Sequence, residues 1–320
     1  MNIVKKTLVL LFVGIISFTY AQDLNEAGTA FNDGNEAYKA KNYAGAVEYY
    51  TSSIDMCQMI GVDAAELQTK VEAQLVNALY KNSMILYKGK KFDAAVEELN
   101  KTITAANTAD NAKIAGKAKA YIPKVYSSQG MGLVKGKKYD EALAIFDKAL
   151  GYKKGCVNAY YGQGMAFKGK NDIDAAVISF DNAIANGEGK KKAAKTLKRV
   201  KSAGQKMLEA NAAKELQIEH TQKAIDYLNK SLEYGATSAN TYYMLAIAYN
   251  KQKKYADAIS AANTGLTIEG ADQSSIQFEL GKAYEGKGDT ANACTAYKAV
   301  VSGPNVKAAA FQAKEVLKCN

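Results

Sequence analysis

The chain has 320 residues, with 42 lysine and arginine residues against 32 aspartate and glutamate residues, and its formal net charge at pH 7 is +10. Hydrophobic residues make up 48% of it, which is enough apolar surface for a continuous core. Arg199 is the only arginine, and phosphates and base edges are read mainly by the arginine fork, so the basic charge does not indicate a nucleic-acid-binding protein.

Residues 1–21 have the pattern of a secretory signal peptide. Two lysines precede a short apolar stretch over 8–18, which is too short to span a bilayer. The sequence Thr-Tyr-Ala over 19–21 places small residues at the two positions that determine cleavage. We expect cleavage before Gln22 and an exported mature chain that is periplasmic or secreted, soluble and not lipid-anchored. An uncleaved signal anchor is the alternative.

One pattern recurs down the rest of the chain. A small residue in one amphipathic segment is followed by a lysine-rich turn, an aromatic residue or isoleucine, an alanine and a bulky apolar residue, as in GMGLVKGKKYDEALAIF at 130–146. The alanines of successive copies are Ala46, Ala95, Ala142, Ala176, Ala224, Ala258 and Ala293. The shortest interval is 34 residues, and three intervals are 13 to 15 residues longer, which is close to four helical turns. This period predicts a solenoid of helical hairpins rather than a globular enzyme.

The three longer intervals predict three long hairpins. Two turns added to the end of one helix and two to the start of the next would preserve the packing faces. Their tips are expected near Gly61, near Asn107–Asn111 and at 186–189, where turn residues cluster. Pro123 lies in the second long arm, so we expect a kink or a helix restart there.

The period and its residues resemble the tetratricopeptide (TPR) repeat, in a protein of the exported bacterial type, over roughly 27–303. The small residues of the first helices are Gly34, Ser83, Gly130, Gly164, Ala212, Ala246 and Gly281. The fifth copy departs from the pattern, because Thr221 replaces the aromatic residue and Glu215 an apolar one. The resemblance implies an all-α fold, a right-handed α-α superhelical solenoid of about seven TPR-like helical hairpins with a C-terminal capping helix. The aromatic residue four positions beyond the alanine is expected to fill the space against the following unit.

The expected organisation follows from these copies. After the signal peptide, residues 22–186 hold units 1–4 and residues 187–303 hold units 5–7 of one continuous solenoid. Residues 304–320 form the capping helix and tail, because Gly303-Pro304 is a helix stop and start signal.

The resemblance also implies a non-catalytic protein that binds a protein or peptide segment in a concave groove lined by the first helices of the hairpins. The groove positions lie three residues before and one residue after each small residue. Aromatic and methionine side chains, which are common on surfaces that bind protein segments, dominate them. The candidate groove residues are Phe31, Tyr80, Met84, Met131, Tyr161, Met165, Tyr243 and Phe278. The alternative is that these rings pack against neighbouring first helices as core.

Lysines crowd the turns inside the hairpins. Stacking would place them on one edge, a basic ridge that attracts anionic polymers at low salt. The candidate ridge residues are Lys41, Lys90, Lys91, Lys137, Lys138, Lys170, Lys253 and Lys254. One alternative is a solubilising edge. Another is binding of an envelope polysaccharide or other anionic polymer through the tyrosine stripe and this ridge.

The sequence contains no pattern that predicts catalysis, a metal or a cofactor. Its single histidine, His220, lies in a turn of the weakest copy, and no nucleophile–base set or glycine-rich phosphate loop accompanies it. Among the four cysteines, Cys294 and Cys319 are the one plausible disulfide pair. Straight antiparallel helices would leave them offset by about 9 Å, so only an end that folds back would join them.

Overall fold

The computed structural model describes residues 23–235 and 238–319, and the predicted signal peptide therefore lies outside the described residues. The chain divides into two compact units, one ending at Gly162 and the other beginning at Gln163. Within the described ranges every regular element is helical and there is no β-strand, which confirms the all-α prediction. No helix in these ranges is long and apolar enough to cross a membrane.

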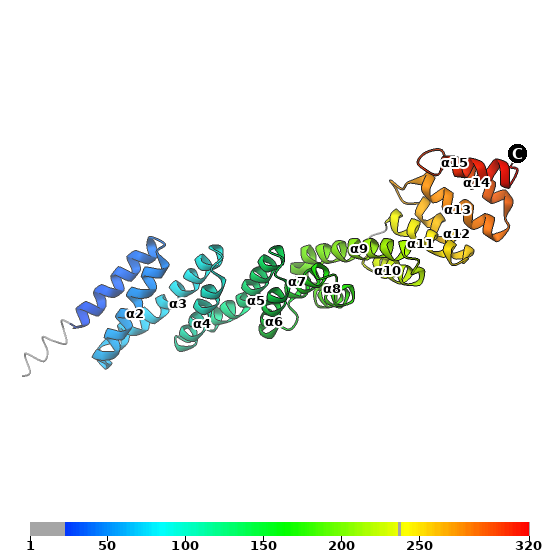
Figure 1. Cartoon of the computed structure of the whole chain (residues 1–320). Helices are drawn as coiled ribbons and strands as arrows, with labels where there is room; N and C mark the ends of the chain where they lie inside the picture. Colours follow the sequence, from blue (N-terminus) through cyan, green and yellow to red (C-terminus); the bar gives the residue numbers. More distant parts are fainter. Residues whose placement is uncertain (1–22, 236–237, 320) are drawn as a thin grey trace, which may run out of the picture. The chain divides into compact units, whose positions relative to one another are not determined.

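The first unit is a run of antiparallel helices, seen from blue to green in Figure 1. Consecutive helices contact one another from α2 through α6. The lysine-rich turns within the repeats therefore lie at one end of the stack, and the connections between repeats, which form the tips of the long hairpins, lie at the other end. The elements are a helix over 23–39, α2 (Tyr43–Ile60), η1 (Val62–Ala64), α3 (Ala65–Lys88), α4 (Phe92–Thr108), α5 (Ala112–Lys135), α6 (Tyr139–Tyr152) and the start of α7 (Val157–Gly169).

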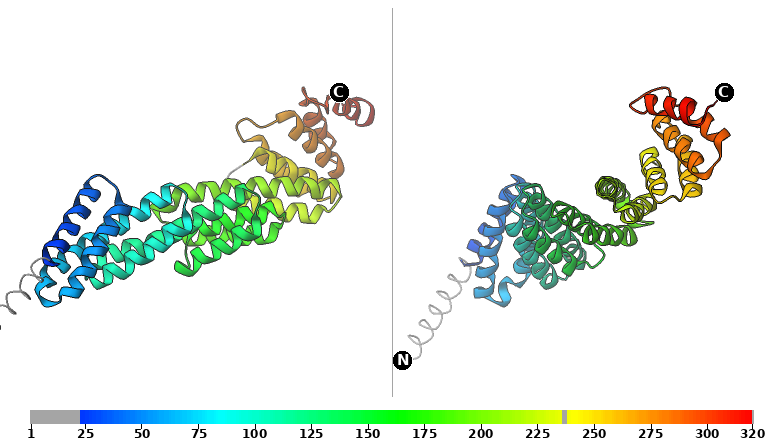
Figure 2. Two further views of the ribbon diagram at one scale, coloured as in Figure 1. Left: turned by 60° about the vertical axis from the view of Figure 1, so that its left-hand side comes forward. Right: turned by 45° about the vertical axis from the view of Figure 1, so that its right-hand side comes forward.

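The second unit is likewise built of antiparallel helices and ends in a short closing helix, drawn in red in Figure 2. Its elements after α7 are α8 (Ile173–Gly187), η2 (Lys191–Ala193), α9 (Ala194–Gln217), α10 (Thr221–Glu233), α11 (Ala239–Lys251), α12 (Tyr255–Leu266), α13 (Gln273–Lys287), α14 (Thr290–Lys298), α15 (Val306–Phe311) and the π-helical turn η3 (Gln312–Val316). The predicted capping helix is thus present, with a widened last turn.

The three long hairpins have their tips where the sequence predicts them, but the added length is shared unequally. The first helices α3, α5 and α9 each have 24 residues against 13 in α7, whereas α2, α4 and α8 have 18, 17 and 15 residues. The expectation of two added turns on each side is therefore wrong, and a single 3₁₀ turn precedes both α3 and α9. The tip residues decide this division, because positive φ at Gly61 and Gly189 ends one helix and an Asn111 cap begins the next.

Pro123 does not restart its helix. The helix α5 runs without interruption from Ala112 to Lys135 with the proline inside it. The hydroxyl of Ser127 donates to the Pro123 carbonyl oxygen at 2.7 Å. Of the two outcomes predicted at Pro123, the restart is therefore wrong, because the neighbouring helices α4 and α6 pack along α5 and hold it, and the kink stays a prediction.

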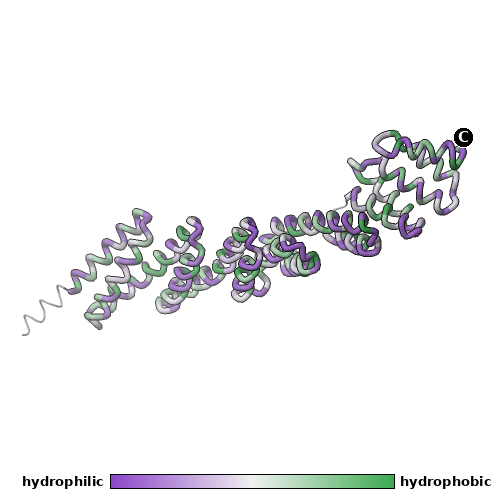
Figure 3. The backbone as a smooth tube through the Cα atoms, viewed as in Figure 1, coloured by the Kyte–Doolittle hydropathy of each residue, from purple (hydrophilic) through white to green (hydrophobic). Residues whose placement is uncertain are grey.

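The core of each unit lies where paired helices cross. All seven alanines that measure the repeat are completely buried. A Cβ on Gly130 would lie 2.5 Å from the Phe146 ring, and equivalent contacts join Gly34 to Tyr50 at 2.6 Å and Gly281 to Tyr297 at 2.6 Å. The aromatic residue therefore fills space first inside its own hairpin, although Phe146 also reaches Gly162 of the next first helix. Hydrophobic and hydrophilic residues alternate along the helices accordingly (Figure 3).

The turns inside the hairpins share a backbone feature that sequence analysis missed. One residue in each turn, five before the buried alanine, has a left-handed backbone with φ between 58° and 82°. Only one of these residues is glycine, and an L side chain at such a φ costs free energy. The turn residues are Lys41, Lys90, Lys137, Asn171, Glu219, Lys253 and Gly288.

Cys294 and Cys319 form a disulfide, with their Cα atoms 5.7 Å apart. The closing helix is not straight, because α15 passes into the π-helical turn η3 and the Cys319 N–H donates to the Ala313 carbonyl oxygen at 2.8 Å. A folded-back end thus brings the two cysteines together. The other two cysteines, Cys57 and Cys156, are buried free thiols, and burial raises the pKa of Cys57.

Candidate functional site

The first helices of the second unit form an apolar pocket, which we call the α9–α11 pocket. It has a volume of about 610 Å³ and is lined by Lys206, Glu209, Ala210, Ala213, Leu216, Gln217, Asn240, Tyr243, Met244, Ile247 and Lys251. Tyr243 lies three residues before the small residue Ala246, and Ile247 lies one residue after it. These are the positions at which the sequence predicts a groove.

The polar groups of the α9–α11 pocket lie at its margins. The Glu209 carboxylate accepts hydrogen bonds from the Thr241 hydroxyl and, at 3.0 Å, from the Gln205 amide. The Tyr243 ring is half-buried against the core, and this burial raises the pKa of its hydroxyl. The pocket therefore combines apolar side chains with one carboxylate, Glu209, and two lysines, Lys206 and Lys251.

The first unit has a pocket of different chemistry, which we call the lysine–tyrosine pocket. It has a volume of about 620 Å³ and involves the first helices α3 and α5 and the first hairpin turn. Its lining residues are Lys41, Tyr43, Tyr80, Lys81, Met84, Ile85, Tyr87, Lys88, Tyr121 and Lys124. Tyr80 and Met84 occupy the same register on α3 as Tyr243 and Ile247 do on α11.

Lys124 is held in place at the lysine–tyrosine pocket by aromatic residues. Its Nζ donates to the Tyr121 hydroxyl at 3.0 Å and lies 4.5 Å from the centre of the Tyr121 ring and 5.5 Å from that of Tyr87. The Tyr87 and Tyr121 rings meet edge to face with centroids 5.5 Å apart. The hydrogen bond to Tyr121 is the largest of the contacts that raise the pKa of Lys124.

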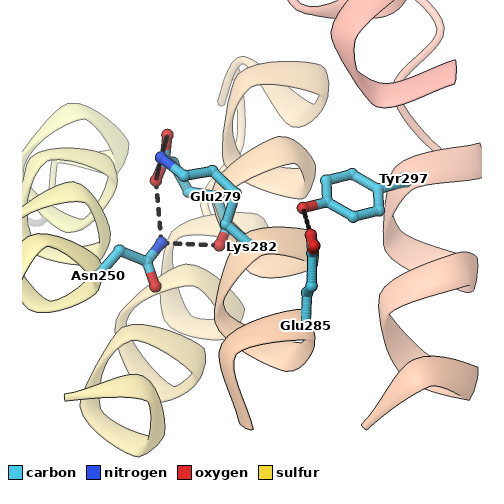
Figure 4. Close-up of polar contacts among 5 residues, drawn as sticks. All are labelled: Asn250, Glu279, Lys282, Glu285 and Tyr297. Atoms are coloured by element: carbon cyan, nitrogen blue, oxygen red, sulfur yellow. Dashed lines mark hydrogen bonds and ion pairs between the residues drawn. The ribbon is translucent and has the colours of Figure 1, made fainter. Parts of the chain in front are cut away.

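A third pocket lies at the C-terminal end, among α11 to α15. Phe278, half-buried against Tyr297, lines it together with Asn250 and Lys282. The carboxylate of Glu279 is buried nearby and accepts hydrogen bonds from Asn250 at 2.9 Å and Lys282 at 3.0 Å (Figure 4). Two of its polar lining residues, Asn250 and Lys282, are therefore engaged in contacts within the protein.

The predicted groove residues are thus distributed over separate pockets. Tyr80 and Met84 lie in the lysine–tyrosine pocket, and Tyr243 and Phe278 lie in the other two. Tyr161 is only 7% exposed, so its ring belongs to the core as the alternative interpretation held. The remaining predicted residues are half-buried and line none of the three pockets, namely Phe31, Met131 and Met165.

Of the ten residues that line the lysine–tyrosine pocket, sequence analysis gave only Lys41, Tyr80 and Met84 as candidates. Lys81, Lys88, Tyr121 and Lys124 were not among the candidates. The signal was present, since Lys81 and Lys88 share one face of α3 with Met84 at helical spacing, and Tyr121 and Lys124 are three residues apart on α5. What the sequence did not show is that these two faces meet.

The predicted ridge lysines lie in or beside the turns inside the hairpins, and all eight are exposed. Lys138 forms an ion pair with Glu141 at 3.0 Å. Lys91, Lys138 and Lys254 occupy the cap position of the following helix but make no side-chain capping bond. Each places a cation at a helix N-terminus, where the helix dipole disfavours it.

The only histidine is engaged in a surface contact. His220 Nδ1 lies 2.9 Å from the Glu215 carboxylate, which also pairs with Lys223 at 3.0 Å. The hydrogen bond from Lys223 is the largest of the contacts that lower the pKa of Glu215. The described part of the chain holds no cluster of three or more residues suited to binding a metal ion.

Comparison with known proteins gives one family. The family model described as Tetratricopeptide repeat matches residues 128–191 and 243–312. No curated protein matches the chain.

Several solved structures resemble the chain at low identity. One is titled YrrB, "a TPR protein with an unusual peptide-binding site", with 17% identity, a TM-score of 0.38, and coverage of 60% of this chain and 91% of that one. MamA gives 18% identity, a TM-score of 0.38, and coverage of 62% and 97%. The P58(IPK) TPR domain gives 13% identity, a TM-score of 0.34, and coverage of 91% and 98%.

Proposed function

Because the chain is a tetratricopeptide-repeat protein, we propose that it is an exported, non-catalytic scaffold that captures protein segments on the first helices of its hairpins. One observation carries this proposal. The same two register positions, occupied by Tyr80 and Met84 on α3 and by Tyr243 and Ile247 on α11, line a pocket in each of the two units. Half-buried aromatic and aliphatic side chains in a preformed hollow are the usual anchors of a protein segment.

The α9–α11 pocket is the apolar member of the pair and suits an aliphatic or aromatic side chain. Its walls bring Leu216, Met244 and Ile247 together with Tyr243. Methionine adapts to side chains of different shape, which favours capture of a segment rather than recognition of one rigid ligand.

Export is supported by two features. The signal-like residues 1–21 predict it, and the Cys294–Cys319 disulfide suits an oxidising compartment. N-terminal sequencing of the protein recovered from outside the cytoplasm tests this proposal. A mature chain beginning at Gln22 would support it, and recovery of an intact chain with Met1 only in the cytoplasm would contradict it.

Peptide selection tests segment capture. A random ten-residue peptide library is panned against the full mature chain and against two variants of the α9–α11 pocket. Tyr243→Ala combined with Ile247→Ala should weaken the selected peptides by about a hundredfold, because losing an anchoring aromatic costs on the order of 2 kcal/mol and the aliphatic residue adds to it. Ala210→Glu places a charge at the exposed mouth of the pocket and leaves the core intact, and it should weaken the same peptides.

The matched control for the second variant is Ser202→Glu. It changes the charge of the same helix by the same amount at an exposed position outside the pocket. Equal binding by Ala210→Glu and Ser202→Glu, with both folded by circular dichroism, would place capture elsewhere. Failure of the unmodified chain to select any peptide would contradict the proposed function itself.

A second candidate is binding of an anionic polymer along the ridge, favoured by the exposure of Lys90, Lys91 and Lys137. Changing these three and Lys138 to glutamine should abolish retention on an immobilised anionic polysaccharide, and added salt should weaken retention of the unmodified chain steeply. Unchanged retention after the substitutions would leave the ridge a solubilising edge.

A further inference from the structure

The lysine–tyrosine pocket contains lysines whose charges are not balanced by carboxylates of the protein. Lys41, Lys81, Lys88 and Lys124 line it, and no aspartate or glutamate does. None of these four lysines forms an ion pair with a carboxylate in the part of the chain that the structure describes. A minority of the lysines elsewhere form ion pairs, as Lys70 does with Glu66 at 2.6 Å and Lys230 with Asp181 at 2.9 Å; the pocket differs in gathering four lysines without a carboxylate. The pocket therefore has a positive potential that the protein itself leaves unneutralised.

We propose that this pocket accepts a carboxylate side chain of an acidic protein segment together with an adjacent apolar side chain. The inference rests on the proposed function, because it names the kind of segment that one of the two pockets selects. It assigns a role to Lys81, Lys88 and Lys124 in reading the charge, and to Tyr80, Met84 and Ile85 in receiving the apolar neighbour.

The cation best placed to meet the carboxylate is Lys124. Its contacts with the Tyr121 hydroxyl and with the Tyr87 and Tyr121 rings fix the ammonium group before a ligand arrives. A lysine that is already ordered loses less side-chain entropy on binding than a free one. The Tyr87 hydroxyl is in turn within 2.9 Å of the Ser128 hydroxyl, so the ring beneath the ammonium is also held.

The shape of the pocket favours a protein segment over a long polyanion. A hollow of about 620 Å³ is large enough for a few side chains. Half-buried tyrosine rings and a methionine cover much of its wall. A polyanion gains little from such a wall, whereas an acidic residue beside a leucine or phenylalanine satisfies both the cations and the apolar surface.

The α9–α11 pocket provides an internal contrast. It occupies the same register of the first helices, but its lining holds two lysines, Lys206 and Lys251, with the Glu209 carboxylate among them, and Lys251 pairs with Glu219 at 3.6 Å. A carboxylate there would meet fewer free cations than in the lysine–tyrosine pocket and would lie near the Glu209 carboxylate. Acidic selectivity should therefore belong to the first unit alone.

The test uses the full mature chain and an array of peptide pairs. Each pair shares one ten-residue sequence with leucine or phenylalanine next to a variable position, which is glutamate in one member and glutamine in the other. The unmodified chain should bind the glutamate members at least about tenfold more tightly, and the preference should shrink as salt is raised. Lys88→Gln combined with Lys124→Gln should abolish the preference while leaving the glutamine members bound, because it removes the ordered cation and a second lysine of the pocket.

The control variant is Lys113→Gln combined with Lys117→Gln. It removes the same charge from two exposed positions of α5 that do not line the pocket. The inference is overturned if the glutamate members are not preferred, if the preference survives in the pocket variant, or if the control variant loses it equally. It is also overturned if heparin binds the unmodified chain but not the Lys88→Gln, Lys124→Gln variant while no glutamate member is preferred. Absence of binding to any peptide would instead contradict capture as such and the inference with it.

Discussion

At the scale of single residues, the glycine at the small-residue position of a first helix is needed because a side chain there would collide with the aromatic ring of the second helix, and not because the backbone requires glycine. Gly130 and Gly132 stand two residues apart in α5, and both have helical neighbours on either side. A Cβ at 130 would meet the Phe146 ring at 2.5 Å, whereas a Cβ at 132 would meet nothing within 4 Å. Gly130 therefore reports the steric effect of a side chain at the helix crossing, and Gly132 reports the cost of glycine in a helix without that contact.

Gly130→Ala should destabilise the protein by about 1–3 kcal/mol, because the extra methyl group overpacks the crossing. Gly132→Ala should stabilise it by about 0.5–1 kcal/mol, because alanine restricts the unfolded chain. Urea denaturation of the two variants measures both. Equal effects of the same sign would mean that the close approach of Phe146 does not determine the choice of glycine.

At the scale of elements, the helices differ in how they begin. The Asn42 side chain accepts a hydrogen bond from the Gly45 N–H at 3.2 Å, and Asp172 and Asp289 cap their helices in the same way. Lys91 has almost the same backbone as Asn42, with φ −82° and ψ 69° against −81° and 74°, but no capping bond. The backbone at Lys91 therefore has the geometry of a capped helix start, but the lysine side chain cannot accept the capping hydrogen bond.

Lys91→Asp should stabilise the protein by about 1 kcal/mol, since it adds a cap and places a negative charge at the helix N-terminus. Asn42→Ala should destabilise it by about the same amount. Thermal denaturation of each variant provides the measurement. No gain from Lys91→Asp would indicate that lysine at this turn already makes a compensating contact in solution.

Capping aspartates also give the stability a pH dependence. Hydrogen bonds from Ser275 lower the pKa of Asp272 at the start of α13, and hydrogen bonds from Asn292 lower that of Asp289 at the start of α14. A carboxylate whose pKa is lowered by folding stabilises the folded state above its unfolded pKa of about 3.9, and this contribution is lost as the pH falls through the folded value.

Asp272→Asn combined with Asp289→Asn should therefore flatten the loss of stability between about pH 5 and pH 2, while asparagine keeps the caps at neutral pH. Urea midpoints across this range test it. An unchanged acid slope in the double variant would show that other carboxylates govern acid unfolding.

At the scale of the whole molecule, the repeat architecture should limit the effect of a destabilising substitution to the hairpins next to it. Within each unit the consecutive hairpins contact one another, so the stability of a unit is close to a sum of local terms. The disulfide between Cys294 and Cys319 closes a segment of 25 residues around α14, α15 and η3. Its loss should loosen that segment and leave distant hairpins alone.

Cys294→Ser combined with Cys319→Ser should reduce the local stability of the C-terminal segment by about 3 kcal/mol. Hydrogen exchange should show faster exchange of amides over 290–316 and unchanged protection in α2 to α5. Loss of protection throughout the chain would mean that the closing helix stabilises more than its own neighbours. The single variants would leave an unpaired thiol and are less suitable.

The repeat period alone determined which residues pair within a hairpin and where the turns fall, because buried alanines recur at helical spacing and Gly61, Asn111 and Gly189 stop or start helices wherever the chain places them. It also located Tyr80, Met84, Tyr243 and Phe278 on first helices. Only the tertiary structure decided that Tyr161 is buried, that Lys81 and Lys124 line one pocket, and that η3 brings Cys319 to Cys294. Those outcomes depend on how neighbouring helices pack and how the last turn widens, and a local period contains no information about either.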